Sequence, residues 1–479
     1  MLDFAEDSES HVFQISPFPD ATASRRFWLQ LTSAGLLSAV RAAEESKRPR
    51  PAGFGRAQSV IIVFTSGGQS QLEMWDPKPG APREIRGSFD SISTSVSGVQ
   101  FGEHMPRTAQ IADRLCVVRN MAHEDLDHGT AFYLAQTGRY HRLRSANPLP
   151  SPSDFPSLAS VLQRVVDSPN PLQNPVHVNG PAEVPNIIGA GQFGGLLGQS
   201  FDPLTVGDVT GGATPLPSLN HHGDVPSPRL RRRQSLLQKV ELAARRLEGL
   251  TLGRDKQQLY SQAFEMLDSR AAREAFDLSQ ESVSLRQKYG RNRSGQACLL
   301  ARRLVEAGIP LVNVIWNHNN RGQDKDPADT DLYGWDTHND IFEALQKHLL
   351  PRFDQSFPAL IEDLEDRGLL ETTLVVCMGE FGRAPLVALE PNFAGGSPGR
   401  KHWSWCYSIA FAGAGVRAGS VVGASDERAA YPVNEPYGPW DVAATIYSAL
   451  GIDPHAEYRD LFDRPIRISE GRVMEEIYG

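Results

Sequence analysis

The chain has 479 residues, of which 40% are hydrophobic and 22% charged, and its formal net charge at pH 7 is −9. This composition is typical of a globular protein long enough for one large domain with insertions or for two domains. An acidic chain of this kind is not expected to bind nucleic acid, and no apolar run reaches the roughly 18 residues that a stable membrane span needs. The four cysteines form no CxxC pair, so they predict neither a zinc ribbon nor a disulfide framework.

The first segment, residues 1–50, carries an arginine pair ahead of a modest apolar run. Arg25 and Arg26, followed by Phe27, predict a twin-arginine export signal that is removed after use. The translocation machinery would then be a partner, and the protein would be periplasmic or otherwise exported. The alternative is an amphipathic N-terminal helix.

Apolar runs that stop at glycine or polar residues predict buried parallel strands. Segments with helical periodicity alternate with them or follow them. This alternation predicts an α/β fold, a doubly wound, mostly parallel sheet flanked by helices, with functional loops at the carboxyl ends of the strands. The predicted strands lie within 59–68, 111–121, 309–317 and 372–382, and the predicted helices within 340–368 and 438–452.

The middle of the chain differs from both ends. Residues 177–307 are first rich in glycine and proline and then, from about 229, strongly helical with almost no strand signal. We interpret this range as covering loops and a helical insertion. Residues 51–176 and 308–479 then form the first and second parts of the α/β core.

The stretch Asp127-His128-Gly129-Thr130 stands directly before a helix-like run that ends in Thr137-Gly138. A polar, glycine-containing turn at a helix N-terminus can bind an anion or hold a reactive side chain against one. The alternative is an ordinary N-cap, with Asp127 or Thr130 closing the first turn of the helix.

Histidines, carboxylates and basic side chains follow the predicted strands. Histidine and carboxylate ligands suit zinc or manganese, and arginine or lysine on the same rim suits an oxyanion such as phosphate or sulfate. Each short segment alone could be structural, but together they could meet at one edge of the sheet. The residues are His123, Asp127, His128, Asp336, His338, Glu380, Arg383, Arg400, Lys401 and His402.

Several ordered motifs resemble known families. MPRTAQIADRLCVVRNMAHEDLDHGTAFYLAQTGRYHR and LEDRGLLETTLVVCMGEFG resemble segments of sulfatases and alkaline phosphatases. GWDTHND and YGRNRSGQACLLARRLVEAGIPLVNV resemble the bacterial domain-of-unknown-function-1501 proteins, which are classed in the alkaline-phosphatase-like superfamily. The resemblance covers the chain from about residue 55 to about residue 470. It implies an alkaline-phosphatase-like fold but no established reaction.

The resemblance also suggests roles for the polar residues. His128 stands at the superfamily's nucleophile position, Glu380 replaces a metal-binding aspartate, and the usual aspartate after the first strand is missing. This implies one retained divalent ion, zinc or manganese, with calcium as a further candidate. Its predicted ligands are Asp336, His338, Glu380 and His402, the predicted catalytic residues are His128, Asp127 and Arg383, and the predicted substrate-binding residues are His123, Thr130, Arg400 and Lys401.

His128 could itself be a metal ligand, a nucleophile or a general base. The leading hypothesis is an exported metal-dependent hydrolase of phosphate or sulfate esters, with a small molecule or a glycan as the substrate. The alternative is a non-catalytic binding or assembly protein on a decayed alkaline-phosphatase-like fold.

Overall fold

The computed structural model describes residues 50–166, 174–211, 270–319 and 333–479. Residues Pro51–Gly479 form one compact unit. The predicted export signal, apart from Arg50, lies outside the described residues, and so do residues 229–269 of the predicted helical insertion. Within the described part, no helix has the length and apolar character that crossing a membrane would require.

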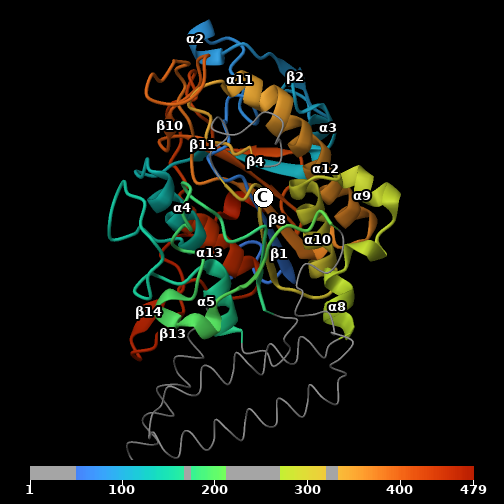
Figure 1. The fold of residues 1–479 in the computed structure, drawn as a ribbon, viewed down its shortest axis with the longest axis vertical. Coiled ribbons are helices and arrows are strands. Elements are labelled where there is room, and N and C mark those ends of the chain that lie inside the picture. The colour runs from blue at the N-terminus through green and yellow to red at the C-terminus, as the bar shows by residue number, and fades with distance from the viewer. Residues whose placement is uncertain (1–49, 167–173, 212–269, 320–332) are drawn as a thin grey trace, which may run out of the picture. The chain divides into compact units, whose positions relative to one another are not determined.

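An eight-stranded sheet forms the centre of the unit, in the order β12-β4-β11-β8-β1-β7-β5-β6 (Figure 1). All neighbouring strands pair in parallel except β11, which runs antiparallel to both β4 and β8. The strands are β1 Ser59–Phe64, β4 Leu115–Met121, β5 Val176–Val178, β6 Leu204–Val206, β7 Leu311–Ile315, β8 Thr373–Met378, β11 Tyr407–Ala412 and β12 Ser420–Val422.

Strand β1 shows why the sheet is buried on both faces. All six residues of its sequence, SVIIVF, are buried, and β-branched runs of this kind suit a parallel strand covered on each side. Ile61 and Val63 pack into one hydrophobic layer, whereas Ile62 and Phe64 pack into the opposite layer.

Helices cover both faces of the sheet (Figure 1). The layer that contains Ile61 is covered by α10 (Arg293–Glu306) and α12 (Leu350–Asp366), and the layer that contains Phe64 is covered by α4 (His128–Thr137), α5 (Leu158–Val165) and α13 (Pro439–Ala449). The predicted fold class, a mostly parallel sheet flanked by helices, is therefore confirmed.

Smaller elements surround this core. The shorter helices are α2 (Arg83–Arg86), α3 (Pro106–Gln110), α8 (Arg270–Phe276), α9 (Val283–Tyr289) and α11 (Ile341–Ala344), which continues into a π-helical turn at Leu345–Leu349. Three two-stranded ladders pair β2 (Ser91–Ser93) with β3 (Gln100–Gly102), β9 (Gly382–Arg383) with β10 (His402–Trp403), and β13 (Glu457–Arg459) with β14 (Pro465–Arg467).

The described residues of the range 177–307 form strands that the sequence pattern does not predict. Strands β5 and β6 extend the main sheet beyond β7, and α10 is a helix buried against the core. Each of these strands has only three residues, which is too short to give a strand pattern in the sequence.

Candidate metal centre

The site lies where parallel strands of the sheet end. Strands β1, β4 and β8 point the same way, so the residues that follow them reach the same edge. His128 begins α4 after β4, and Glu380 follows β8 directly. Asp336 is brought to this edge because the N–H of the preceding Trp335 donates to the Ser66 carbonyl after β1, at 3.1 Å.

Three imidazoles surround one carboxylate oxygen. Asp336 Oδ1 lies 3.1 Å from His128 Nε2, 3.1 Å from His338 Nε2 and 3.3 Å from His402 Nε2. The Nε2 atoms of His338 and His402 are 2.8 Å apart. One ligand atom from each residue lies within 4.8 Å of all the others. We call these four residues the histidine–aspartate cluster.

Two of the three rings are held by hydrogen bonds from Nδ1. His128 Nδ1 donates to Glu380 Oε1 at 2.7 Å, and His402 Nδ1 donates to the Leu126 carbonyl at 2.7 Å. A carboxylate or carbonyl acceptor at one ring nitrogen fixes the tautomer and turns the other nitrogen toward a metal, as in many metal sites. His338 Nδ1 has no hydrogen-bond partner among the described residues, but its ring stacks on Phe393, with centroids 3.8 Å apart and planes 6° apart.

This arrangement favours a cation at its centre. Because Nδ1 of His402 donates, Nε2 of the neutral ring presents a lone pair to Asp336 Oδ1 at 3.3 Å. Two acceptors at this distance repel each other unless a cation lies between them or a donor such as the His338 Nε2–H, 2.8 Å from His402 Nε2, is shared by both. Three imidazoles and one carboxylate fit zinc or manganese, whereas calcium prefers oxygen ligands throughout.

The electrostatics agree with this geometry. Burial alone would lower the pKa of His128, but the carboxylates of Asp336 and Glu380 outweigh burial and raise this pKa to about 9. Burial would raise the pKa of Asp336, but His128 and Arg383 hold it well below its ordinary value. Burial and the charge of His128 lower the pKa of His402 to about 3. The carboxylates therefore attract positive charge to this position.

Glu380 is buried and lies outside the four ligand atoms. Its Oε1 accepts from the Gly67 N–H at 2.8 Å and from His128. Its Oε2 has no hydrogen-bond partner among the described residues. In this structure, Glu380 therefore orients His128 instead of completing the set of ligand atoms.

Arg383 contacts the cluster, but its donors are occupied by protein acceptors. Nη2 donates to Asp336 Oδ1 at 2.8 Å and to the Gly67 carbonyl, and Nε donates to the Gly68 carbonyl at 3.1 Å. The side chain is fully buried. With Nη1 donating to the Arg400 carbonyl at 3.3 Å, four of the five N–H groups of this guanidinium have protein acceptors.

The remaining basic candidates also have protein partners. Arg400 is fully buried and pairs with Glu73, with Nη2 and Oε1 2.6 Å apart. The mostly exposed Lys401 ammonium lies 2.8 Å from Glu390. Neither side chain makes a hydrogen bond or ion pair with the histidine–aspartate cluster among the described residues.

The three other predicted site residues lie in the turn before α4 or in its first turn. His123 Nε2 donates to the Glu380 carbonyl at 2.7 Å, and the Thr130 hydroxyl donates to Asp125 Oδ1 at 2.6 Å. Asp127 occupies the N-cap position of α4 but makes no capping bond with its side chain; it accepts from the Asn147 amide at 3.0 Å. Thus neither Asp127 nor Thr130 uses its side chain to cap the helix.

Three contributors to the site were not singled out from the sequence. They are the Gly67 N–H, the Leu126 carbonyl and the Phe393 ring. A backbone group carries no residue-specific signal. Phe393 lies in a loop far along the chain from His338, so only the folded structure reveals their contact.

The chain resembles several solved structures at low identity. A protein in the alkaline phosphatase superfamily from Vibrio parahaemolyticus is 11% identical, with 84% of this chain and 69% of that chain covered and a TM-score of 0.42. A phosphonate monoester hydrolase from Silicibacter pomeroyi is 14% identical, with 88% and 77% covered and a TM-score of 0.38. A sulfatase from Pseudoalteromonas sp. is 12% identical, with 87% and 70% covered and a TM-score of 0.36.

Among curated proteins, none matches the chain. A family profile does match, over residues 57–478, and its description is "Protein of unknown function (DUF1501)". This match includes the whole sheet and every residue of the histidine–aspartate cluster. The chain therefore belongs to the DUF1501 family.

Proposed function

We propose that the protein is a metal-dependent hydrolase of phosphate or sulfate esters. The observation that carries this proposal is the histidine–aspartate cluster, in which three Nε2 atoms converge on Asp336 Oδ1. The cluster lies at the carboxyl edge of a mostly parallel sheet, where α/β proteins bind their ligands. The sequence resemblance to sulfatases and alkaline phosphatases supports the choice of ester.

The residues that would hold the ion are His128, Asp336, His338 and His402, and zinc or manganese suits them best. When bound, such an ion polarises an ester oxygen and lowers the pKa of a coordinated water. Glu380 fixes the ring of His128 by accepting from Nδ1. His402 has the most exposed side chain of the four, at 19%, so substrate would approach from its side.

An anionic substrate is favoured by the position of α4. The positive end of the helix dipole lies at His128, the first residue of this ten-residue helix. His128, and Arg383 through its 2.8 Å contact, hold the pKa of Asp336 well below its ordinary value against the effect of burial. Arg383 is thus a positioning residue in this proposal and acts on substrate only through the cluster.

The metal content of the purified protein tests the proposal. We expect about one divalent transition metal per chain, together with hydrolysis of 4-nitrophenyl phosphate or 4-nitrophenyl sulfate. Asp336→Ala should lose both metal and activity, because it removes the charged ligand. Glu427→Ala, which removes an exposed acid elsewhere, should retain both. A wild-type protein without stoichiometric metal would contradict the proposal.

A second candidate function, binding or assembly without catalysis, is favoured by one observation. Arg383 and Arg400, expected from the sequence to meet an oxyanion, donate instead to Asp336, Glu73 and backbone carbonyls. A metal-loaded protein that hydrolyses no member of a panel of aryl phosphates and sulfates would favour this function.

Export through the twin-arginine machinery is also proposed, from the sequence of residues 1–50. Replacing Arg25 and Arg26 with lysine should leave the protein in the cytoplasm, because that machinery recognises the arginine pair. Cell fractionation measures the distribution. Unchanged export of the double variant would exclude this route.

A further inference from the structure

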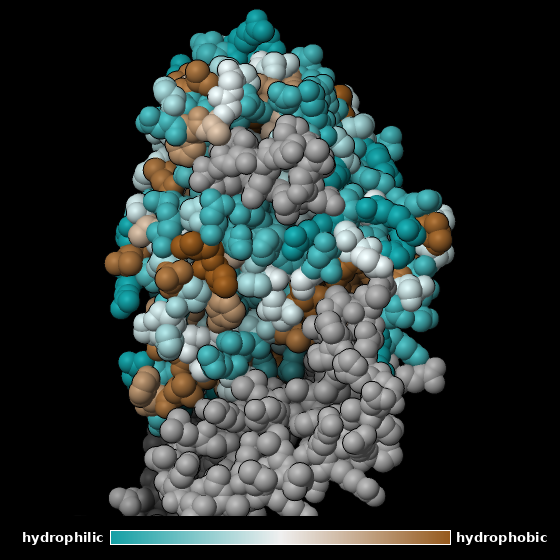
Figure 2. Space-filling model, viewed as in Figure 1, coloured by the Kyte–Doolittle hydropathy of each residue, from teal (hydrophilic) through white to brown (hydrophobic). Residues whose placement is uncertain are grey.

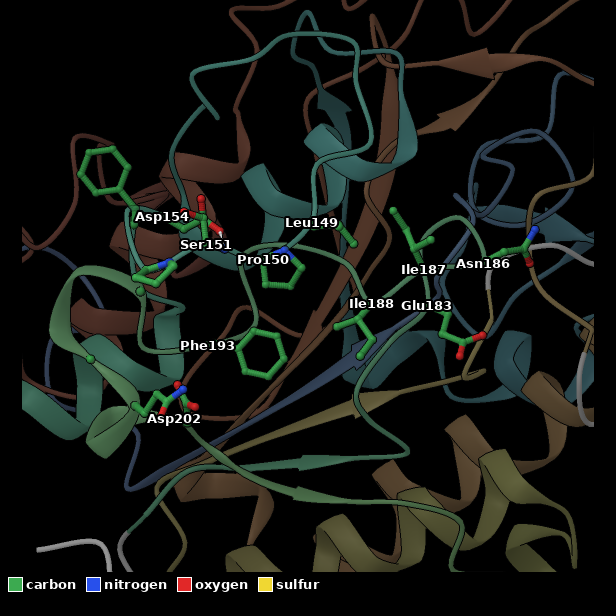
Figure 3. Close-up of a pocket in the computed structure, with 16 residues that line it drawn as sticks. Leu149, Pro150, Ser151, Asp154, Glu183, Asn186, Ile187, Ile188, Phe193 and Asp202 are labelled. Carbon is green, nitrogen blue, oxygen red and sulfur yellow. Dashed lines mark hydrogen bonds between the residues drawn. The ribbon is translucent and has the colours of Figure 1, made fainter. Parts of the chain in front are cut away.

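A cavity of about 690 Å³ lies between two loop segments on the side of the sheet that carries α4 and α5 (Figure 3). Residues 149–155, which precede α5, form one wall, and residues within 183–202 form the other. This volume is within the range of small-molecule sites in proteins, roughly 300–1,000 Å³.

The centre of the cavity is apolar. Leu149, Ile188 and Phe193 face one another there (Figure 3). Leu149 and Ile188 are 68% and 42% exposed, so both have apolar surface that a ligand could cover. Hydrophobic residues also gather beside the position of α4 in the space-filling view (Figure 2). Burying such side chains against an apolar ligand is favourable by about 25 cal/mol per Å².

The ends of the cavity are acidic. Asp154 and Asp202 lie at one end and Glu183 at the other (Figure 3). Among the described residues that line the cavity there is no lysine or arginine. Two of the three acids lie near an imidazole: Asp154 is 3.5 Å from His141 Nε2, and Glu183 is 3.4 Å from His318 Nε2. Such a lining disfavours a ligand that carries several negative charges.

One wall is joined to the helix that carries His128. Asn147, two residues before Leu149, accepts from the Gly129 N–H at 2.8 Å and donates to Asp127 at 3.0 Å. These are the two neighbours of His128 in the chain. The wall is therefore anchored directly beside a residue of the histidine–aspartate cluster.

The opposite wall is joined to the end of β1. The Asn319 amide donates to Glu183 at 3.2 Å, and the Asn317 amide donates to the carbonyls of Asn319, at 2.5 Å, and Ser66, at 3.3 Å. The Gly67 N–H, next in the chain, binds Glu380. Both walls are thus linked by hydrogen bonds to residues beside the candidate metal centre.

We propose that this cavity is the subsite for the organic group of the ester substrate, and that this group is uncharged and apolar, such as an aryl or alkyl group. The apolar centre provides the binding surface, and the acidic ends select against sulfated or phosphorylated glycans with several charges. This assignment of substrate class rests on the proposed ester hydrolysis.

Calorimetric titration of the purified protein with 1-naphthol tests the subsite without requiring hydrolysis. We expect one naphthol to bind per chain, and Ile188→Trp to weaken binding at least about tenfold, because the indole fills the apolar centre. The matched control is Val283→Trp, which enlarges an aliphatic side chain that is 62% exposed on α9, outside the cavity. It should bind naphthol as the wild type does.

Hydrolysis assays then separate this inference from the proposed function. For 1-naphthyl phosphate, Ile188→Trp should raise KM with little change in kcat, because it removes binding that is uniform along the reaction. Three results would overturn the subsite even if esters are hydrolysed. Naphthol does not bind the wild type, it binds Ile188→Trp equally well, or a sulfated disaccharide displaces it. Naphthol binding lost in Ile188→Trp, without hydrolysis of any ester, would support the cavity and overturn the proposed function.

Discussion

Two buried arginine–carboxylate pairs in this protein differ in how fully their charges are satisfied. Arg400 and Glu73 form a closed pair, with Nη2 at 2.6 Å and Nε at 3.1 Å from carboxylate oxygens, and further Arg400 donors reach backbone carbonyls. In the second pair, Arg383 Nη2 lies 2.8 Å from Asp336 Oδ1. The same oxygen of Asp336, however, faces three imidazole nitrogens as well.

The difference separates a structural pair from a binding site. A buried ion pair whose donors and acceptors match gains nothing from another ion. In the histidine–aspartate cluster, by contrast, imidazole lone pairs face a carboxylate oxygen. A bound cation would stabilise this arrangement. Sequence composition alone cannot distinguish the two, since both are arginine–carboxylate pairs near strand ends.

The largest expected effect is on the closed pair. Arg400→Met should lower the free energy of unfolding by about 3–5 kcal/mol, because it leaves the Glu73 carboxylate buried without its partner. Chemical denaturation measures the loss. Metal bound per folded molecule should not change. The double variant Arg400→Met with Glu73→Gln should recover part of the stability. If Arg400→Met alone lowers the free energy of unfolding by less than about 1 kcal/mol, the Arg400–Glu73 pair does not stabilise the fold as proposed.

The second prediction concerns pH in the metal-free protein. The pKa of His128 is raised in the folded state to about 9, so its protonation stabilises the fold fully below pH 6.5 and this contribution is lost as pH rises to about 9. The loss is on the order of 3 kcal/mol. Unfolding midpoints at several pH values, with and without chelator, measure it.

The metal-loaded protein should keep its stability over the same interval, because the ion replaces the proton. His128→Gln, treated with chelator, should show no such loss. A metal-free wild type whose stability is constant between pH 6.5 and 9 would show that the two carboxylates do not hold a proton on His128.

The third prediction concerns Glu380. Glu380→Gln should weaken metal binding by about 10–100-fold, the usual effect of removing a partner that orients a ligand. Competition with a fluorescent chelator measures the dissociation constant. Asp336→Asn should weaken binding more. If the two variants lose metal to the same extent, Glu380 binds the ion directly, as expected from the sequence.

The smallest expected effect concerns Phe393. Phe393→Ala should weaken metal binding by about tenfold or less, because the ring that stacks on His338 is removed while every ligand remains. Phe393→Tyr retains the stacking ring and should restore the wild-type affinity. Equal affinities for Phe393→Ala and the wild type would show that His338 needs no aromatic support.

The fold could be predicted from the sequence where the pattern was long. Strands β1, β4, β7 and β8 are runs of β-branched and other apolar residues, and a run buried on both faces is a clear signal of a parallel strand. Strands β5 and β6, with three residues each, carry no such signal. The antiparallel β11, YSIAFA, was not singled out, and strand direction has no signature in the residues themselves.

Prediction was less complete at the site. His128, Asp336, His338 and His402 could be selected because they are histidines and a carboxylate in segments that the sequence places at one edge of the sheet. The partners of Arg383 and Arg400 could not, because which acceptor a guanidinium meets depends on segments hundreds of residues away. Gly67 and Glu73, for example, are 316 and 327 residues from the arginines they contact. Pairing of β9 with β10 places Arg383 opposite His402, which no local pattern indicates.

The distance along the chain between the cluster's parts has a consequence for metal loading. His402 and the Leu126 carbonyl that holds it are 276 residues apart, and His128 and Glu380 are 252 residues apart. No part of the chain shorter than about this interval presents the complete site, so the site can form only after most of the chain has been synthesised. The compartment in which the chain folds would therefore determine which metal the proposed site receives. Under the proposed twin-arginine export, which carries folded proteins, that compartment is the cytoplasm.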